Sequence, residues 1–326
     1  MPSYLVTGVA GFIGSKVAEF LLSDGHNVLG VDNMNQAYDV RLKRWRLEHL
    51  LQNRSFKFYE MDIADKEKIE SLFKENSKIE AVINLAARAG VRQSVEDPWV
   101  YFDTNVIGTI NLLEMCRKYE VGKFVLASSS SVYGKSSSMP YKEDTNTDEP
   151  LSPYASSKKS AETLCYTYHY LYNLDITVFR YFTVYGPAGR PDMSLFRFVQ
   201  WIMEDRPIVV FGDGSQSRDF TYIDDIARGT ILGLRPLGYQ IINLGSDEPV
   251  VLMDAIKLIE RFTGKKARIK YLPKHPADVP ATWADISKAS KFLGWRPETR
   301  FEDGVKKLVS WYKENRQWAK EINTEI

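Results

Sequence analysis

Tyr154 and Lys158 are the side chains of this 326-residue protein whose types and spacing are best suited to acid–base chemistry. A separation of four residues places both on one face of a helix. An ammonium group close to a phenol stabilises the phenolate, so we expect Lys158 to lower the pKa of Tyr154 from its ordinary value of about 10. Ser152 and Pro153 precede the pair and are typical of a helix cap and a first helical turn. The pattern predicts a tyrosine base at the start of a helix.

A run of four serines, Ser128 to Ser131, is the second group of candidate reactive residues. It follows the apolar run Lys123 to Ala127, which has the length and composition of a buried strand. Side chains at the carboxyl end of a parallel strand face the crevice in which α/β proteins bind their ligands. We therefore expect the serine hydroxyls to face the same crevice as Tyr154.

Three glycines near the N-terminus, Gly8, Gly11 and Gly14, follow the pattern G-x-x-G-x-x-G. They connect a strand-like run, Tyr4 to Thr7, with the apolar helical spacing of Phe12 to Ser23. Glycines at such a turn permit a tight bend, a close approach to a pyrophosphate and close helix–strand packing. The helix N-terminus then offers free N–H groups to the phosphates. This pattern predicts a dinucleotide cofactor.

Asp32 indicates which dinucleotide binds. It ends the second predicted strand and lies 18 residues after Gly14, close to the usual distance of about 20. An acidic side chain there accepts hydrogen bonds from the adenosine ribose and repels a 2′-phosphate, so we expect NAD rather than NADP. Asp62 and Ile63 are placed for the adenine edge. The candidate cofactor residues are Gly8, Gly11, Phe12, Ile13, Gly14, Asp32, Asn33, Asp62, Ile63, Leu85, Ala86, Ala87, Tyr154 and Lys158.

The elements that must position these residues alternate between short apolar runs and helical stretches. This order predicts an α/β fold with a Rossmann-type, doubly wound parallel sheet, followed by a smaller mixed α/β C-terminal substrate domain. We assign residues 1–180 to the NAD-binding domain and expect the chain to return to it at about 219–247. Residues 181–218 and 248–326 then form the substrate domain.

The composition argues against several other classes of protein. With 43 basic and 42 acidic residues the formal net charge is +1, which does not suit a nucleic-acid-binding protein. Two cysteines, Cys116 and Cys165, exclude a disulfide framework, and the four histidines have no metal-ligand spacing. No apolar run approaches the ~20 residues that span a bilayer. We expect a cytoplasmic protein without a metal, a membrane or a nucleic-acid partner.

The ordered motifs resemble the extended short-chain dehydrogenase/reductase family of nucleotide-sugar epimerases and dehydratases, and within it the epimerases that act on UDP-glucuronate. The resemblance covers essentially the whole chain. Besides the glycine turn and Tyr-x-x-x-Lys, it rests on Asp32 to Asn35, Ala89 to Arg92, Ser128 to Gly134, Arg180 to Pro187, Gly189 to Met193, Arg218 to Asp225 and Asp278 to Thr282.

The resemblance implies three catalytic residues, Tyr154, Lys158 and Ser129. Tyr154 would remove the proton of the sugar 4-OH while hydride passes to a tightly bound NAD, which is regenerated in each cycle. Ser129 would hydrogen-bond O4, and Lys158 would hold the cofactor ribose. Dehydratases of the family usually carry Asp-Glu where this chain has Ser130 and Ser131, which argues against dehydration.

The same resemblance assigns the UDP-sugar substrate. Arg218 would bind the β-phosphate, Asp278 the uridine ribose and Phe211 the uracil, although His275 stands where many relatives have an arginine. For the uronate carboxylate we expect contacts from Thr183 and Ser130, joined by Arg190 or Arg92. Arg190 has two readings, because it either binds the diphosphate or braces its own loop.

Four alternatives remain at this point. They are a UDP-glucose 4-epimerase, a UDP-N-acetylhexosamine 4-epimerase, a UDP-glucuronate decarboxylase that makes UDP-xylose, and an inactive NAD-binding scaffold on the same fold. Relatives are commonly homodimers through two helices per subunit. The tyrosine-rich segment from Tyr154 to Tyr172 is the candidate for that face, or else it is core packing.

Overall fold

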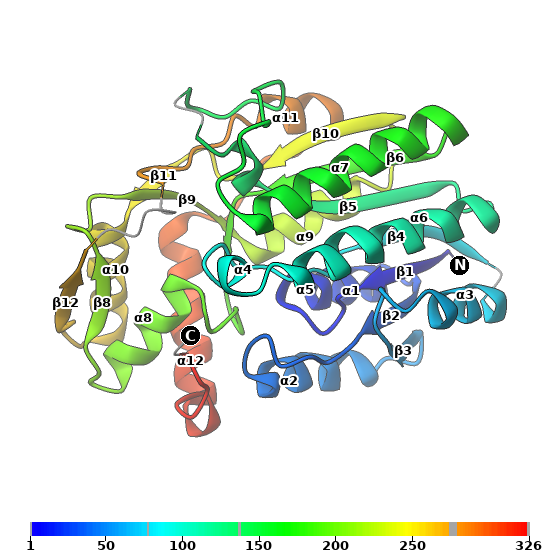
Figure 1. Cartoon of the computed structure of the whole chain (residues 1–326). Helices are drawn as coiled ribbons and strands as arrows, with labels where there is room; N and C mark the ends of the chain where they lie inside the picture. The colour runs from blue at the N-terminus through cyan, green and yellow to red at the C-terminus, as the bar shows by residue number, and fades with distance from the viewer. Residues whose placement is uncertain (1, 77, 136–137, 274–278, 325–326) are drawn as a thin grey trace.

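A seven-stranded parallel sheet forms the centre of the computed structural model, which describes residues 2–76, 78–135, 138–273 and 279–324 (Figure 1). Every strand pair in this sheet is parallel. In spatial order the strands are β10 (Tyr239–Leu244), β6 (Asp175–Tyr181), β5 (Lys123–Ser129), β4 (Ile79–Asn84), β1 (Ser3–Thr7), β2 (Asn27–Asp32) and β3 (Phe56–Glu60). The direction of winding reverses between β1 and β4, and ligands of open α/β sheets bind at such a point.

Helices cover both faces of this sheet, as expected where strands are apolar on both sides. One face carries α1 (Phe12–Ser23), α2 (Val40–Leu51), α9 (Ile223–Leu232) and α11 (Ser287–Leu293). The other, toward the viewer in Figure 1, carries α3 (Lys66–Glu75), α6 (Gly108–Lys118) and α7 (Pro153–Tyr172). Short helices α4 (Gln93–Glu96) and α5 (Trp99–Phe102) and a π-helical turn, Asp103–Ile107, lead into α6.

A smaller part of the molecule lies beside the carboxyl ends of the strands (Figure 1). It contains a three-stranded sheet, with β9 (Ser217–Tyr222) between β11 (Pro249–Val251) and β7 (Thr183–Tyr185), and a parallel pair, β8 (Ile208–Phe211) with β12 (Ile269–Leu272). Its helices are α8 (Ser194–Met203), α10 (Leu252–Thr263) and α12 (Phe301–Ala319), and a hydrophobic core joins them that also includes Phe12 of α1 and Leu42 of α2.

The predicted fold class, a Rossmann-type parallel sheet with a smaller α/β part, is confirmed. Within the range 219–247, where we expected the chain to return, α9 and β10 lie with the large sheet. Strand β9, in contrast, belongs to the small three-stranded sheet. Among the residues that the structure describes, no helix combines the length and the apolar character needed to cross a bilayer.

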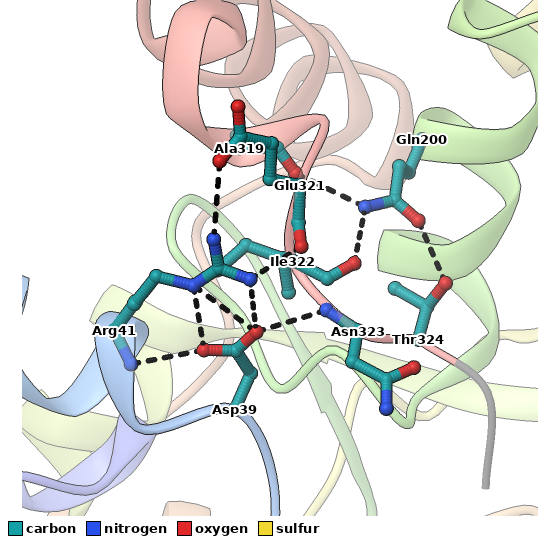
Figure 2. Close-up of polar contacts among 8 residues, drawn as sticks. All are labelled: Asp39, Arg41, Gln200, Ala319, Glu321, Ile322, Asn323 and Thr324. Carbon is teal, nitrogen blue, oxygen red and sulfur yellow. Dashed lines mark hydrogen bonds and ion pairs between the residues drawn. The ribbon is translucent and has the colours of Figure 1, made fainter.

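The last described residues pack against the start of α2 (Figure 2). The Asp39 carboxylate caps α2 by accepting from the Arg41 N–H (3.1 Å), and it also accepts from the Asn323 N–H (2.9 Å). The Arg41 guanidinium donates to the Glu321 carbonyl oxygen and lies 3.4 Å from the Glu321 carboxylate. We call these four residues the C-terminal clasp. It connects the loop after β2 to the end of α12.

Candidate active site

A pocket of about 350 Å³ opens at the carboxyl ends of β1 to β6. Its wall combines residues from both parts of the molecule, and most of the predicted site residues lie on it. These are Gly8, Gly11, Phe12, Ile13, Gly14, Asp32, Asn33, Asp62, Ile63, Leu85, Ala86, Ala87, Ser129, Ser130, Tyr154, Lys158, Thr183 and Arg190.

The glycine turn is packed so tightly that side chains are excluded. Gly8 has a φ of +65°, and a Cβ on it would lie 2.7 Å from the backbone nitrogen of Ala86. A Cβ on Gly14 would lie 2.1 Å from the carbonyl oxygen of Gly8. Helix α1 begins directly after Gly11, so its first N–H groups border the pocket. The turn therefore has the cradle that a dinucleotide pyrophosphate requires.

Asp32 ends β2 as a buried carboxylate, with only 6% of the residue exposed. It accepts from the N–H of Ala10 (3.2 Å) and from that of Met34 (2.9 Å), which ties the β2 end to the glycine turn. The buried ammonium of Lys43 on α2 lies 3.2 Å away and pairs with it. Sequence reasoning missed Lys43, because a lysine in a charged helical stretch gives no sign that it points inward.

Asn33 and Asp62 contact each other on the same side of the pocket. The Asn33 amide donates to the Asp62 carboxylate at 2.8 Å, and its oxygen accepts from the Asn35 amide at 2.7 Å. This contact holds Asn33 and Asp62, two predicted cofactor residues from different loops, next to each other.

Tyr154 stands in the first turn of α7, opposite the end of β5. The predicted cap is confirmed, because the Ser152 hydroxyl accepts from the Ala155 N–H at 3.2 Å and Pro153 opens the helix. The Tyr154 side chain interacts with that of Ser129. Burial raises the pKa of Tyr154, while the Ser129 contact and the positive charge of Arg190 act to lower it.

Lys158 is almost fully buried, and its ammonium donates to the carbonyl oxygen of Ala127 at 2.7 Å. Burial lowers the pKa of Lys158 to about 8, and the charge of Glu162 partly opposes this. The prediction that Lys158 depresses the pKa of Tyr154 is therefore wrong for this structure. Burial dominates at Tyr154, and the groups that oppose it are Ser129 and Arg190.

A buried network supports the serine strand from behind. The Ser128 hydroxyl donates to Glu162 of α7 at 2.5 Å. Arg180 of β6 contacts both oxygens of the same carboxylate, at 3.0 and 2.8 Å, and its guanidinium lies 4.9 Å from the ring centre of Tyr133. This bidentate ion pair fixes β5 and β6 against α7, the helix that carries Tyr154 and Lys158.

Arg190 lies on the pocket wall within a loop of the smaller part. Its guanidinium pairs with the Asp192 carboxylate, with Nε 3.0 Å from Oδ1, and stands 5.8 Å from the ring centre of Tyr38. A long hydrogen bond of 3.4 Å reaches the carbonyl oxygen of Ala89. These contacts brace the loop, while the position on the wall leaves the ligand-binding reading open.

Three other predicted substrate residues, Arg92, Phe211 and Arg218, do not line this pocket. Arg92 and Phe211 are nevertheless brought together from the two parts, since the guanidinium carbon lies 4.1 Å from the ring centre. Arg218 on β9 donates to the carbonyl oxygen of Ser217 at 2.8 Å. Asp278 and His275 lie outside the described residues. In the described part of the chain, no group of His, Cys, Asp and Glu forms a metal-binding cluster.

Comparisons with known proteins identify relatives over nearly the whole chain. Residues 5–308 match the family model described as GDP-mannose 4,6 dehydratase. A UDP-glucuronate 4-epimerase of Thermodesulfobacterium geofontis is 60% identical over 99% of both chains.

Solved structures with a similar fold include two nucleotide-sugar epimerases. A UDP-glucuronic acid 4-epimerase of Bacillus cereus in complex with UDP-glucuronic acid and NAD is 39% identical, with a TM-score of 0.90 over 96% of this chain and 99% of that one. A UDP-glucose 4-epimerase of Thermotoga maritima with UDP-glucose is 33% identical, with a TM-score of 0.89 over the same shares.

Proposed function

The chain belongs to the GDP-mannose 4,6-dehydratase family of extended short-chain dehydrogenases/reductases, and from this premise we propose that it is an NAD-dependent epimerase interconverting UDP-glucuronate and UDP-galacturonate at C4. The observation that carries the proposal is one pocket with two functional walls. One wall has the glycine turn and Asp32, and the other has Ser129, Tyr154 and Lys158.

The glycine turn, which borders the pocket and leaves no room for a Cβ at Gly8 or Gly14, fits NAD, as does the buried carboxylate of Asp32. When bound, NAD supplies a reversible acceptor for the hydride of C4. We propose that the first N–H groups of α1 hold the pyrophosphate and that Asp32 holds the adenosine ribose. Lys158, whose ammonium is fixed by the Ala127 carbonyl, would hold the second ribose.

The chain's own part in the reaction is the movement of one proton. In the proposal, the Tyr154 phenolate takes the proton of the sugar 4-OH and later returns it to the same oxygen. The Ser129 hydroxyl, already in contact with Tyr154, donates to O4 and keeps that oxygen between the two groups. Inversion requires the 4-keto sugar to turn inside the pocket before the C4–H bond forms again.

A uronic acid adds a hazard at this stage, because a C4 ketone is β to the C6 carboxylate and a β-keto acid readily loses CO₂. We propose that Ser130 and Thr183 hold the carboxylate out of the geometry for C–C cleavage, and that Arg190 contributes positive charge. All three line the pocket. If Ser130→Ala and Thr183→Val alter neither the affinity for UDP-glucuronate nor the yield of UDP-xylose, these residues do not hold the carboxylate.

The function is tested with purified protein, UDP-glucuronate and no added NAD, followed by proton NMR. We expect UDP-galacturonate, formed with cofactor that copurifies. Accumulation of UDP-xylose would assign a decarboxylase instead, and turnover of UDP-glucose alone would assign a hexose epimerase. Absence of turnover with every UDP-sugar, despite bound NAD, would indicate an inactive NAD-binding scaffold.

Replacing Ser129 with alanine should shift the pH dependence of the reaction. Tyr154 acts as the phenolate, so kcat/KM rises with pH toward the pKa of Tyr154, which the Ser129 contact lowers. Loss of the Ser129 contact moves the rising limb of the pH profile of kcat/KM to higher pH. Together with the loss of the donor to O4, this lowers kcat/KM at pH 7 by about 10²-fold. Ser129→Thr, which keeps a hydroxyl, should restore the limb. A limb at the wild-type pH in Ser129→Ala would contradict the assignment.

We further propose a homodimer through the helices on the α7 side of the sheet. Large apolar side chains are exposed there, including Trp99 (79% exposed) and Tyr170 (76%), together with Val95, Ile107 and Tyr166. Light scattering should give twice the chain mass, and Tyr170→Glu should yield a monomer. A monomeric wild-type protein would contradict the proposal.

We also propose which parts of the chain bind each ligand. NAD binding would fall to residues 1–180 with the returning segment near 219–247, and the UDP-sugar to 181–218 and 248–326. The cytoplasmic location stays a prediction.

A further inference from the structure

Arg46 lies at the junction of the two parts of the molecule, and its environment is unusual for an arginine. It projects from α2, is only 4% exposed, and packs between the rings of Phe12 and Tyr38, each with its centre 5.7 Å from the guanidinium carbon. A buried cation is costly unless its donors are all satisfied.

Each of the five N–H donors of Arg46 has a partner, and every partner is a neutral oxygen. Nε and Nη2 donate to the carbonyl of Ala188 (3.1 and 2.6 Å), and Nη2 also donates to that of Gly189 (3.2 Å). Nη1 donates to the carbonyl of Ala10 (3.1 Å) and to the Tyr38 hydroxyl (2.8 Å). Only a planar five-donor group meets this set of acceptors.

These acceptors belong to three separate pieces of the site. Ala10 is inside the glycine turn, Tyr38 is in the loop after β2, and Ala188 and Gly189 directly precede Arg190 in the smaller part. Ala188 has a φ of +50°, a conformation that a non-glycine residue keeps only where its surroundings impose it. The two hydrogen bonds from Arg46 to its carbonyl are such a constraint.

We propose that Arg46 is a positioning residue that sets the cofactor turn and the Arg190 loop at one fixed distance. It touches neither Tyr154, Lys158 nor Ser129, which stand on α7 and β5. Its loss is therefore expected to weaken the binding of NAD at the glycine turn and of the sugar beside the Arg190 loop, while the chemical step is retained. The effect on the sugar rests on the proposed function, whereas the effect on NAD does not.

The test compares Arg46→Met, Arg46→Lys and a control, Arg44→Met, which removes an exposed arginine two residues earlier on the same helix. For each we measure the NAD that stays bound through gel filtration, the Kd for added NAD, and KM and kcat at saturating NAD on the alkaline plateau. For Arg46→Met we expect both Kd and KM to rise at least about tenfold, with kcat within about threefold of wild type.

Arg46→Lys keeps the charge but not the fork, so it should resemble Arg46→Met more than wild type, and Arg44→Met should match wild type. A folded Arg46→Met with unchanged NAD retention and KM overturns the proposal, as does a loss confined to kcat or to the melting temperature. If Arg46→Met does not fold, the same criteria apply to Arg46→Lys. If wild type has no UDP-glucuronate activity, the proposed function fails while the NAD comparison still decides the role of Arg46.

Discussion

Tyr154→Phe should lower kcat by about 10²- to 10⁴-fold while leaving the binding of NAD and UDP-glucuronate nearly unchanged. The substitution removes one hydroxyl from a side chain that also packs edge-on against Tyr101, with ring centres 6.1 Å apart. The phenyl ring preserves this packing, so the change isolates the proton-transfer group. Steady-state kinetics gives kcat, and calorimetric titration with UDP-glucuronate gives the affinity.

The matched control is Tyr101→Phe, which removes the hydroxyl of the neighbouring ring. That hydroxyl donates a long hydrogen bond of 3.4 Å to the carbonyl oxygen of Ala89. Its loss should change kcat far less than Tyr154→Phe does. If Tyr154→Phe retained more than about a tenth of wild-type kcat, another group would have to be the base.

Arg180→Met should lower the free energy of unfolding by about 3–5 kcal/mol, since it leaves the Glu162 carboxylate buried without its cation. Both side chains are nearly inaccessible, at 2% and 3% exposure, and the pair is bidentate. Urea denaturation at pH 7 measures the change.

Two comparisons make this test specific. Arg261→Met removes one side of an exposed pair, Arg261 with Glu302, and should cost less than Arg180→Met. The double variant Arg180→Met/Glu162→Leu should recover part of the loss, because the Glu162 carboxylate is then no longer buried without the Arg180 cation. A loss under about 1 kcal/mol for Arg180→Met would show that the pair contributes little to stability.

The parts of the site that the sequence predicts are those specified by local spacing. The turn is indicated by Gly8, Gly11 and Gly14, because the backbone geometry there excludes a Cβ. The start of α7 is indicated by the capping residue Ser152 and by Pro153 in the first turn. This start fixes the position of Tyr154. The parallel pairing of the large sheet follows from the alternation of apolar runs and helices, because parallel strands need crossover connections.

The parts that the sequence does not predict depend on contacts between distant segments. Lys43 and Arg46 read as members of a charged helix, yet they turn inward to Asp32 and to the Ala188 carbonyl. The raised pKa of Tyr154 was missed for a related reason. Helical spacing shows that Lys158 is near, but the depth of burial, which dominates here, is a property of the assembled pocket.

The C-terminal clasp links the time course of biosynthesis to the cofactor site. Asp39 and Arg41 find partners 284 and 280 positions later in the chain. The N-terminal segments leave the ribosome first, so the start of α2 lacks these partners until residues 321–323 have emerged. The loop between β2 and α2, which lines the adenosine side of the pocket, would gain its last supports only then. Stable loading with NAD is thus expected to follow the emergence of this segment rather than precede it.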